Sequence, residues 1–311
     1  MTAYIILKTW TGNKGDRHAG LWDCVCRRRD QGAAHVGVLL ALEEEGLLPD
    51  YVAGTSAGGI VAGIYGAGVD LGMMKEVVQW MSRHGNRFLD PDIIGILTFL
   101  PQLFTGQEVS LTGLLKGNRL MNFLCQLTEG AAIEEVKRKL LIPAVDLNSG
   151  DTIAFTNLME NGITDAARHQ ENVKWEKNGP LCEIMMASAS VPAVFQPRRV
   201  GNYCMVDGGV TNNLPVDLLI AAGVKRVVAV DIGADYRTPH DKSIMEIASH
   251  SFSIMSRDLK ECRSSGEILL LKPELKKGAG LLTFEYMESC MEDGYHYTKR
   301  QMKVIKRALG R

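Results

Sequence analysis

The sequence lacks any run of about 18 consecutive apolar residues, the length that a helix needs to cross a bilayer. Its N-terminus also lacks a positively charged segment followed by an apolar core, so no signal peptide is expected. The formal net charge is only -1, and runs of one sign such as 27–29 and 43–45 are short. Overall charge therefore indicates no nucleic-acid partner, and a cytoplasmic location is expected.

The sequence also lacks paired Cys-x-x-Cys units, which argues against a zinc ribbon. Its seven cysteines are scattered and odd in number. Free, buried thiols in a reducing compartment are the expectation for such a chain. No metal ion and no cofactor is expected.

What the chain does have is enough material for one large core. It contains 311 residues, of which 46% are hydrophobic and 23% charged, values typical of globular proteins. Residues 1–22 show no periodicity and are predicted to be a poorly ordered or non-native segment, whereas residues 23–311 are predicted to form a single domain. No internal repeat or linker interrupts this second range.

Strand and helix patterns alternate along the chain. Such alternation predicts an α/β fold, with a mostly parallel central sheet covered by helices on both faces. Short apolar strands are expected at 51–53, 140–146, 152–156, 203–206, 226–232 and 267–271. Helices are expected at 33–46, 60–68, 70–84, 110–127, 181–189, 214–222, 243–260 and 285–309.

A candidate nucleophile lies between the first of these strands and a helix of small residues. Gly54-Thr55-Ser56-Ala57-Gly58 matches the pattern G-x-S-x-G, in which small neighbours allow the sharp turn that projects the serine. The following helix N-terminus would direct free N–H groups, including that of Ala57, at a developing oxyanion. The alternative interpretation is a Gly/Ser turn without chemistry.

A serine nucleophile needs a base, and two interpretations stay open. Asp207 follows a strand and opens a turn with Gly208 and Gly209, so it could approach a neighbouring strand end. Among the seven histidines, His240 has the chain order of a catalytic histidine but no typical setting. Ser56 would thus act with Asp207 alone, or in a Ser-Asp-His triad of an α/β-hydrolase esterase.

Taken together, these residues resemble the patatin-like phospholipases in their bacterial form. The resemblance covers roughly residues 32–233. It rests on the Ser56 motif, on the helix pattern GAAHVGVLLALEEEG at 32–46, on ASASVPAVF at 187–195 and on Asp207-Gly208-Gly209 with Asn212-Asn213. It implies a three-layer α/β/α fold and a Ser–Asp dyad, carried here by Ser56 and Asp207. It further implies lipid acyl esters as substrates, an acyl-enzyme intermediate and no metal requirement.

The chain departs from the family in the glycine-rich loop whose N–H groups form the oxyanion hole. The corresponding positions read Arg27-Arg28-Arg29-Asp30-Gln31-Gly32, and only Gly32 fits. A reading-frame difference that converts GGC glycine codons into CGG arginine codons is one hypothesis. The other is a true variant with a different oxyanion hole, or a catalytically inactive lipid-binding protein.

An apolar segment at 91–106 is interrupted by Gly95 and Pro101. Two interpretations stay open for it. The segment could contact lipid or cover an acyl pocket, which would agree with peripheral contact with a membrane. It could instead be an ordinary buried helix pair with a break at the proline.

Overall fold

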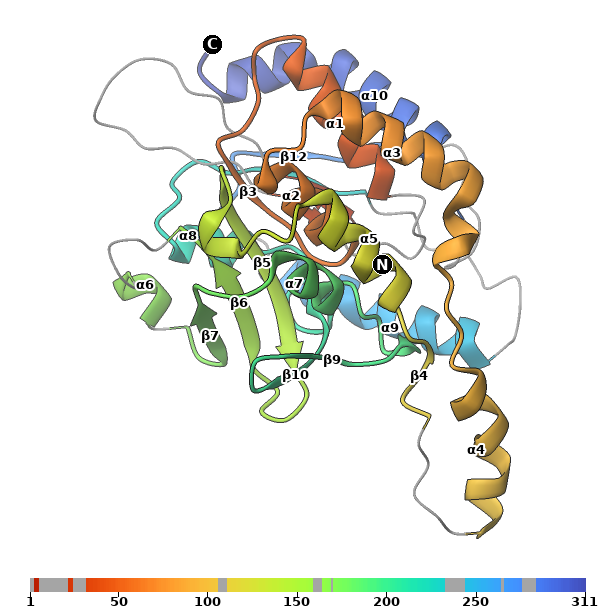
Figure 1. The fold of residues 1–311 in the computed structure, drawn as a ribbon. Coiled ribbons are helices and arrows are strands. Elements are labelled where there is room, and N and C mark those ends of the chain that lie inside the picture. Colours follow the sequence, from red (N-terminus) through yellow and green to blue (C-terminus); the bar gives the residue numbers. More distant parts are fainter. Residues whose placement is uncertain are drawn as a thin grey trace.

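The fold is known from a computed structural model (Figure 1). The structure describes nine ranges of the chain, namely 3–5, 22–24, 32–105, 111–158, 164–168, 170–232, 244–263, 266–275 and 284–311. In these ranges, no helix is both long enough and apolar enough to cross a membrane.

A six-stranded sheet forms the centre of the molecule. Its order is β7-β6-β5-β10-β9. β3 lies along the same edge of β5 as β10, because β3 pairs with residues 139–141 and β10 with residues 144–146. These strands are β3 (Tyr51–Ala53), β5 (Lys139–Asp146), β6 (Thr152–Thr156), β7 (Val173–Glu176), β9 (Arg198–Val200) and β10 (Tyr203–Asp207). Two shorter sheets pair β4 (Gly113–Leu115) with β8 (Ala193–Phe195), and β11 (Val228–Val230) with β12 (Leu269–Leu271).

The expectation of a mostly parallel sheet is met only in part. β3 runs parallel to β5 and β6 runs parallel to β7, but the β5–β6, β5–β10 and β9–β10 pairs are antiparallel. Tight turns explain two of these pairs, because a short connection can join only antiparallel strands. Gly150 and Gly201 lie in these turns with φ of 78° and 58°, a conformation that favours glycine.

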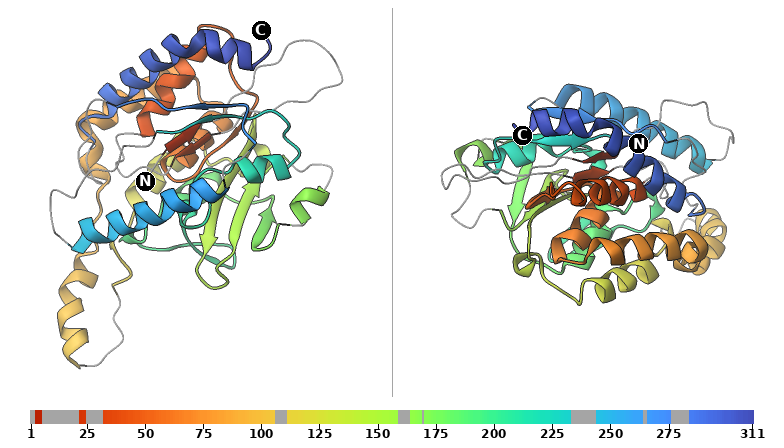
Figure 2. Two further views of the ribbon diagram at one scale, coloured as in Figure 1. Left: turned by 180° about the vertical axis from the view of Figure 1, so that it is seen from behind. Right: turned by 90° about the horizontal axis from the view of Figure 1, so that it is seen from above.

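Helices cover the sheet from both sides (Figures 1 and 2). α5 and α7 lie in front of the sheet in Figure 1, and α9 lies behind it. The longer helices are α1 (Ala33–Glu43), α2 (Ala57–Ala67), α3 (Leu71–His84), α4 (Ile93–Thr105), α5 (Asn118–Leu127), α7 (Leu181–Ser188), α9 (Ile244–Arg263) and α10 (Met287–Ala308). The described short helices are α6 (Asp165–Arg168), α8 (Val216–Ala221), η2 (Gly85–Phe88), η3 (Ile133–Glu135) and η4 (Gly208–Val210).

The first and last long helices pack together closely. A Cβ atom on Gly37 of α1 would collide with the backbone of Met291 in α10, and one on Gly294 of α10 would collide with the backbone of Ala34. The two glycines therefore permit an approach that other residues would prevent. This contact fixes α1, whose first turn lies at the candidate site.

Most predicted elements are confirmed within one to three residues of their predicted ends. The helix predicted at 110–127 is an exception, because α5 begins only at Asn118. The preceding residues Gly113–Leu115 instead form β4, which runs parallel to β8. Residues 91–106 differ too, because α4 continues through Gly95 and Pro101 as a single helix with exposed apolar side chains, and the buried helix pair is wrong.

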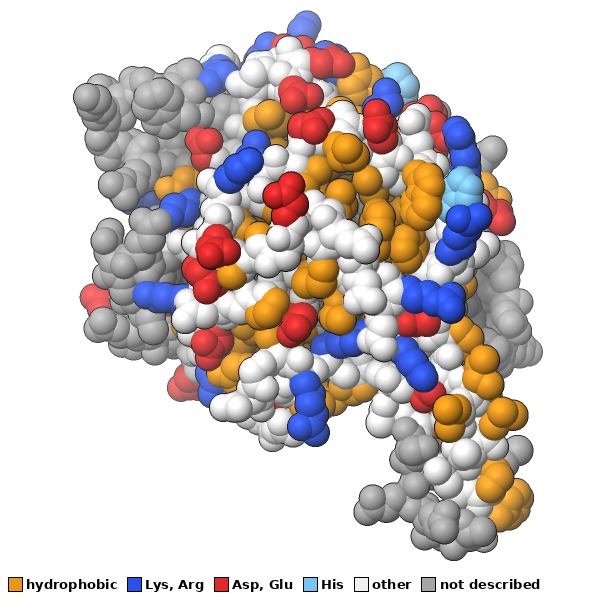
Figure 3. Space-filling view, in the orientation of Figure 1, with side chains coloured by type: hydrophobic (Ala, Val, Ile, Leu, Met, Phe, Trp, Pro, Cys, Tyr) orange, Lys and Arg blue, Asp and Glu red, His pale blue; other side chains and the backbone are white. Residues whose placement is uncertain are grey.

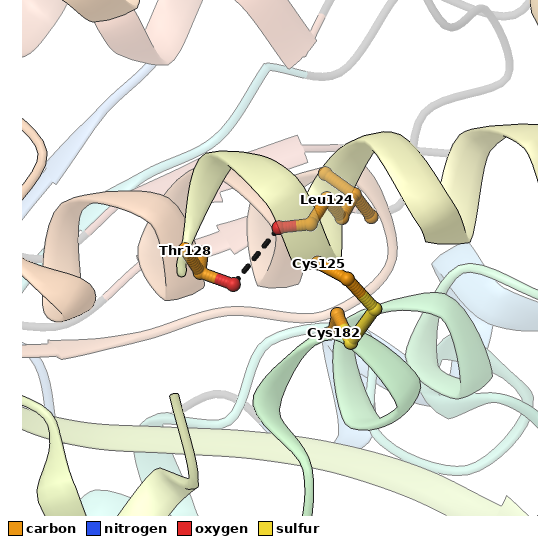
Figure 4. The surroundings of a disulfide bond; sticks show 4 residues. All are labelled: Leu124, Cys125, Thr128 and Cys182. Carbon is orange, nitrogen blue, oxygen red and sulfur yellow. Dashed lines mark hydrogen bonds between the residues drawn. A yellow bond between two sulfur atoms is a disulfide. The ribbon is translucent and has the colours of Figure 1, made fainter. Parts of the chain in front are cut away.

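The expectation of free thiols is wrong for two cysteines. Cys125 of α5 and Cys182 of α7 form a disulfide, with their Cα atoms 5.0 Å apart (Figure 4). The two residues are 57 positions apart, so no local spacing signals the pair. Cys290 and Cys204 form no disulfide, as expected, and the first is buried whereas the second is half-buried.

The N-terminal segment is described only in part. Ala3–Ile5 forms a strand, β1, which pairs antiparallel with β2 (Trp22–Cys24). The other residues of 1–22 lie outside the described residues, so the division between 1–22 and 23–311 remains a prediction.

Candidate active site

Ser56 occupies a sharp turn between β3 and α2. Its backbone angles are φ 60° and ψ -128°, which a residue with a side chain rarely adopts. Small residues make the turn possible, since a Cβ on Gly59 would lie only 3.0 Å from the carbonyl oxygen of Gly54. The Gly58 N–H closes the turn on the Thr55 carbonyl at 3.1 Å. The predicted strand–turn–helix geometry is confirmed.

Asp207 lies at the end of β10, directly beside this turn. Its Oδ2 accepts a hydrogen bond of 2.6 Å from Ser56 Oγ. Its Oδ1 accepts one of 2.8 Å from the Gly209 N–H. Gly208 is needed here, because a Cβ would collide with the Pro143 carbonyl of β5. The two predicted residues, 151 positions apart in sequence, are thus in direct contact.

The Asp207 carboxyl is fully buried, with 0% of the residue exposed to solvent. Burial raises the pKa of Asp207 to about 7, although the hydrogen bonds from Ser56 and Gly209 act in the opposite direction. A carboxyl group with a pKa near neutrality is suited to accepting a proton at physiological pH.

Two serines at the end of α7 support this contact. Ser188 Oγ accepts a hydrogen bond of 3.0 Å from the Ser56 N–H and donates one of 2.7 Å to the Pro143 carbonyl. The Ser190 carbonyl accepts a hydrogen bond of 2.9 Å from the Asp207 N–H. Both serines belong to a motif of the sequence analysis, which assigned them no role. The feature that could have indicated one is the run of small residues directly after an apolar helix.

The N-termini of α1 and α2 meet at Ser56. Gly32 immediately precedes α1, and a Cβ on it would lie 2.9 Å from the Ala57 Cβ, so little room separates the two backbones. Ala57 is the first residue of α2, and N–H groups of a first helical turn have no partner within the helix. Residues 27–31, which hold the three arginines, lie outside the described residues.

An apolar cavity of about 110 Å³ extends from Ser56. Its walls come from α1, α2, α3, α5, the 189–195 segment and the start of α10. Ile64, Val78, Leu124 and Phe284 are examples of its lining. Among the described residues that line it, Ser56 alone has a polar side chain. The cavity therefore offers an apolar surface next to the Ser56 hydroxyl.

The structure supplies no histidine to this site among its described residues. His35 is the nearest in sequence, and its Nδ1 lies 3.2 Å from the Gly32 carbonyl oxygen. His84 and His296 contact aromatic rings elsewhere. His240 lies outside the described residues. The described ranges also contain no cluster of three or more side chains that could hold a metal ion.

The family profile described as patatin-like phospholipase matches residues 31–220, more than half of the chain. The chain belongs to the patatin-like phospholipase family. Both Ser56 and Asp207 lie inside the matched range, whereas Phe284 and Met287, which complete the cavity wall, lie beyond it.

Two relatives of this patatin-like chain are each 25% identical to it. An uncharacterized NTE family protein of Mycobacterium tuberculosis is 25% identical over 213 residues, which make up 67% of this chain and 48% of that protein. Patatin-like phospholipase domain-containing protein 6 of Homo sapiens is 25% identical over 208 residues, 67% of this chain and 13% of that protein. The chain thus spans about half the length of the mycobacterial relatives it matches.

Two further proteins are similar to this chain. The protein named lysophospholipase NTE1 of Debaryomyces hansenii is 25% identical over 214 residues, 67% of this chain and 12% of that protein. Among solved structures, VipD from Legionella pneumophila covers 88% of this chain and 65% of its own, with 14% identity and a TM-score of 0.42.

Proposed function

We propose that this patatin-like chain hydrolyses acyl esters of lipids, with Ser56 as nucleophile and Asp207 as its only base. The observation that carries the proposal is the 2.6 Å hydrogen bond from Ser56 Oγ to the buried Asp207 carboxylate. The apolar cavity at Ser56 supports a hydrocarbon acyl group, and the lysophospholipase name of one relative supports a lipid ester.

The reaction proceeds in two halves. Asp207 accepts the Ser56 hydroxyl proton as Oγ attacks the ester carbonyl carbon, and the tetrahedral intermediate then expels the alcohol, which takes that proton from Asp207. Water attacks the resulting acyl-serine and gives a proton to Asp207. Collapse of the second intermediate releases the fatty acid and returns the proton to Ser56.

The negative charge on the carbonyl oxygen needs fixed donors during both halves. The Ala57 N–H lies at the positive end of α2, next to Ser56, and supplies one. The Gly32 N–H, where the α1 backbone approaches Ala57, is the proposed second. Loss of one such donor typically lowers kcat by about 100- to 1000-fold.

The proposed base predicts a pH profile. Asp207 can accept a proton only when ionised, and burial raises its pKa to about 7. For a neutral soluble ester, kcat/KM should therefore fall about tenfold per pH unit below pH 7 and level off above it. A histidine base titrates in the same region. The profile is therefore measured for wild type and for His240→Gln; an unchanged profile supports Asp207, whereas loss of activity on replacing His240 supports the triad.

The proposed acyl site predicts a change in chain-length preference. Val78 is 5% exposed and lines the cavity from α3. Val78→Phe should lower kcat/KM for a long-chain p-nitrophenyl ester at least about tenfold, since excluding two methylene groups removes about 1.6 kcal/mol of burial. Hydrolysis of the acetate ester should stay within about twofold. Val304→Phe, at an exposed position of α10, is the matched control. Equal losses for both esters would contradict an acyl role for the cavity.

A further inference from the structure

Helix α4 projects from the body of the molecule (Figures 1 and 2). It leaves the body after Asp92 and extends well beyond the sheet and its covering helices. No charged residue occurs from Ile93 to Thr105. An uncharged helix that extends from the body of a protein is unusual in water, because apolar surface is normally removed from solvent.

Large apolar side chains of α4 are open to solvent. Ile93 is 60% exposed, Ile94 71%, Leu97 71% and Phe104 84%. With Ile96, which is 43% exposed, they span about 160° of the helix circumference at about 100° per residue. Thr98 of α4 donates its hydroxyl to the Ile94 carbonyl at 2.9 Å. Gln102, another polar side chain of this helix, is half-buried. One side of the projecting helix is therefore lined by exposed apolar side chains.

The root of α4 is firmly attached. The Asp92 N–H donates to the Leu114 carbonyl at 2.8 Å, and the Lys116 N–H donates to the Asp90 carbonyl at 2.9 Å. The Asp90 carboxylate accepts hydrogen bonds from the Gly117, Asn118 and Arg119 N–H groups and so caps α5. Both aspartates are buried, with at most 9% exposed. The projection is thus held in place by the body.

Cations surround this root. Arg87 and Arg119 are exposed neighbours, since the Arg119 guanidinium donates to the Arg87 carbonyl at 3.2 Å. Lys116 lies beside them, 3.6 Å from the buried Asp92 carboxylate. Figure 3 shows Lys and Arg side chains gathered where α4 leaves the body. An apolar projection with cations only at its root matches a bilayer, in which a hydrocarbon interior lies beneath charged headgroups.

We propose that α4 inserts into an anionic lipid bilayer while Arg87, Lys116 and Arg119 bind the headgroups. The position of the root relative to the cavity gives this docking a consequence. β4, which follows α4, pairs with β8, and Val194 and Phe195 of β8 line the cavity that reaches Ser56. The β4–β8 pair therefore links the root of α4 to one wall of the cavity. Membrane binding itself requires no catalysis and stands apart from the proposed function.

The test measures sedimentation of the full chain with vesicles. Vesicles of phosphatidylcholine alone are compared with vesicles of equal parts phosphatidylcholine and phosphatidylglycerol. Ile94→Asp with Leu97→Asp should weaken binding to the anionic vesicles at least about 100-fold, because two exposed apolar side chains lose their burial. Leu147→Asp with Val304→Asp is the control, since it adds the same charge at two sites that are 54% and 48% exposed.

Two further variants separate insertion from attraction. Phe104→Ser removes one apolar side chain without adding charge and should weaken binding about tenfold. Arg87→Gln with Arg119→Gln should weaken binding only to the anionic vesicles and reduce its salt dependence. Ser56→Ala should bind like wild type, and the α4 variants should still hydrolyse a soluble short ester if the proposed function is also right.

Three outcomes would overturn the proposal. The first is that the wild-type chain fails to bind anionic vesicles. The second is that the α4 double variant and the control double variant lose binding equally. The third is that the α4 double variant turns a dimer into a monomer without changing vesicle binding. The last outcome would assign α4 to contact with a second copy of the chain.

Discussion

Replacing Asp207 with Asn should lower kcat for a soluble p-nitrophenyl ester by several orders of magnitude. The amide has almost the same shape and can still accept the Gly209 N–H, but it cannot take the Ser56 proton. The kcat effect is measured at pH 8, where wild-type Asp207 would be ionised. A loss below about tenfold would show that Ser56 finds its base elsewhere.

The same variant should keep its fold. The pKa of Asp207 is raised to about 7 in the folded protein, because burial favours the protonated carboxyl. Its contribution to the free energy of unfolding is therefore fully present below pH 4 and is lost as the pH rises through 7. The shift from an ordinary value of 3.8 corresponds to about 4 kcal/mol at most. Asp207→Asn lacks this loss, so thermal unfolding at pH 8 should occur at or above the wild-type temperature. A lower temperature would indicate that Asp207 serves the fold.

Replacing Ser56 with Ala should reduce ester hydrolysis to the rate of the buffer. No second hydroxyl donates to the Asp207 carboxylate among the described residues, so the substitution leaves no nucleophile in that place. Ester hydrolysis is followed with short and long p-nitrophenyl esters. Ser251→Ala, which removes an exposed hydroxyl on α9, is the control and should leave the rate unchanged. Wild-type rates in Ser56→Ala would exclude Ser56 as the nucleophile.

The backbone at Ser56 adds a second expectation for this position. Its φ of 60° disfavours any side chain, so alanine keeps the strain whereas glycine relieves it. The free energy of unfolding of Ser56→Gly should therefore exceed that of Ser56→Ala by about 1–2 kcal/mol, and thermal unfolding measures the difference. Equal stabilities of the two variants would show that the turn stores no strain.

Local pattern was enough to predict the two central residues of the candidate site. Gly54 and Gly58 around Ser56 indicate a tight turn, and Gly208 after Asp207 indicates a close approach of two backbones. Both features require small residues at fixed positions, so the sequence alone reveals them. Their contact was expected from strand ends that gather at one edge of a parallel sheet, but it arises in another way. β3 runs parallel to β5 and β10 runs antiparallel to it, so the ends of β3 and β10 meet midway along β5.

Features that depend on distant parts of the chain could not be predicted in this way. Strand direction depends on how each connection crosses the sheet, and nothing local in Arg198–Val200 shows that β9 forms a hairpin with β10. The Cys125–Cys182 disulfide arises where α5 and α7 meet. The exposure of α4 was likewise open, since an apolar run has the same composition in a core and on a projection.

The most direct test of the proposed Ser–Asp chemistry is covalent labelling with a fluorophosphonate, followed by mass spectrometry of the digested protein. The proposed mechanism predicts one label, on the peptide that contains Ser56, in the wild-type chain. Labelling should be lost in Ser56→Ala and strongly slowed in Asp207→Asn, while His240→Gln should label like wild type. An unlabelled wild-type chain, or a label on another residue that persists in Ser56→Ala, would contradict the account.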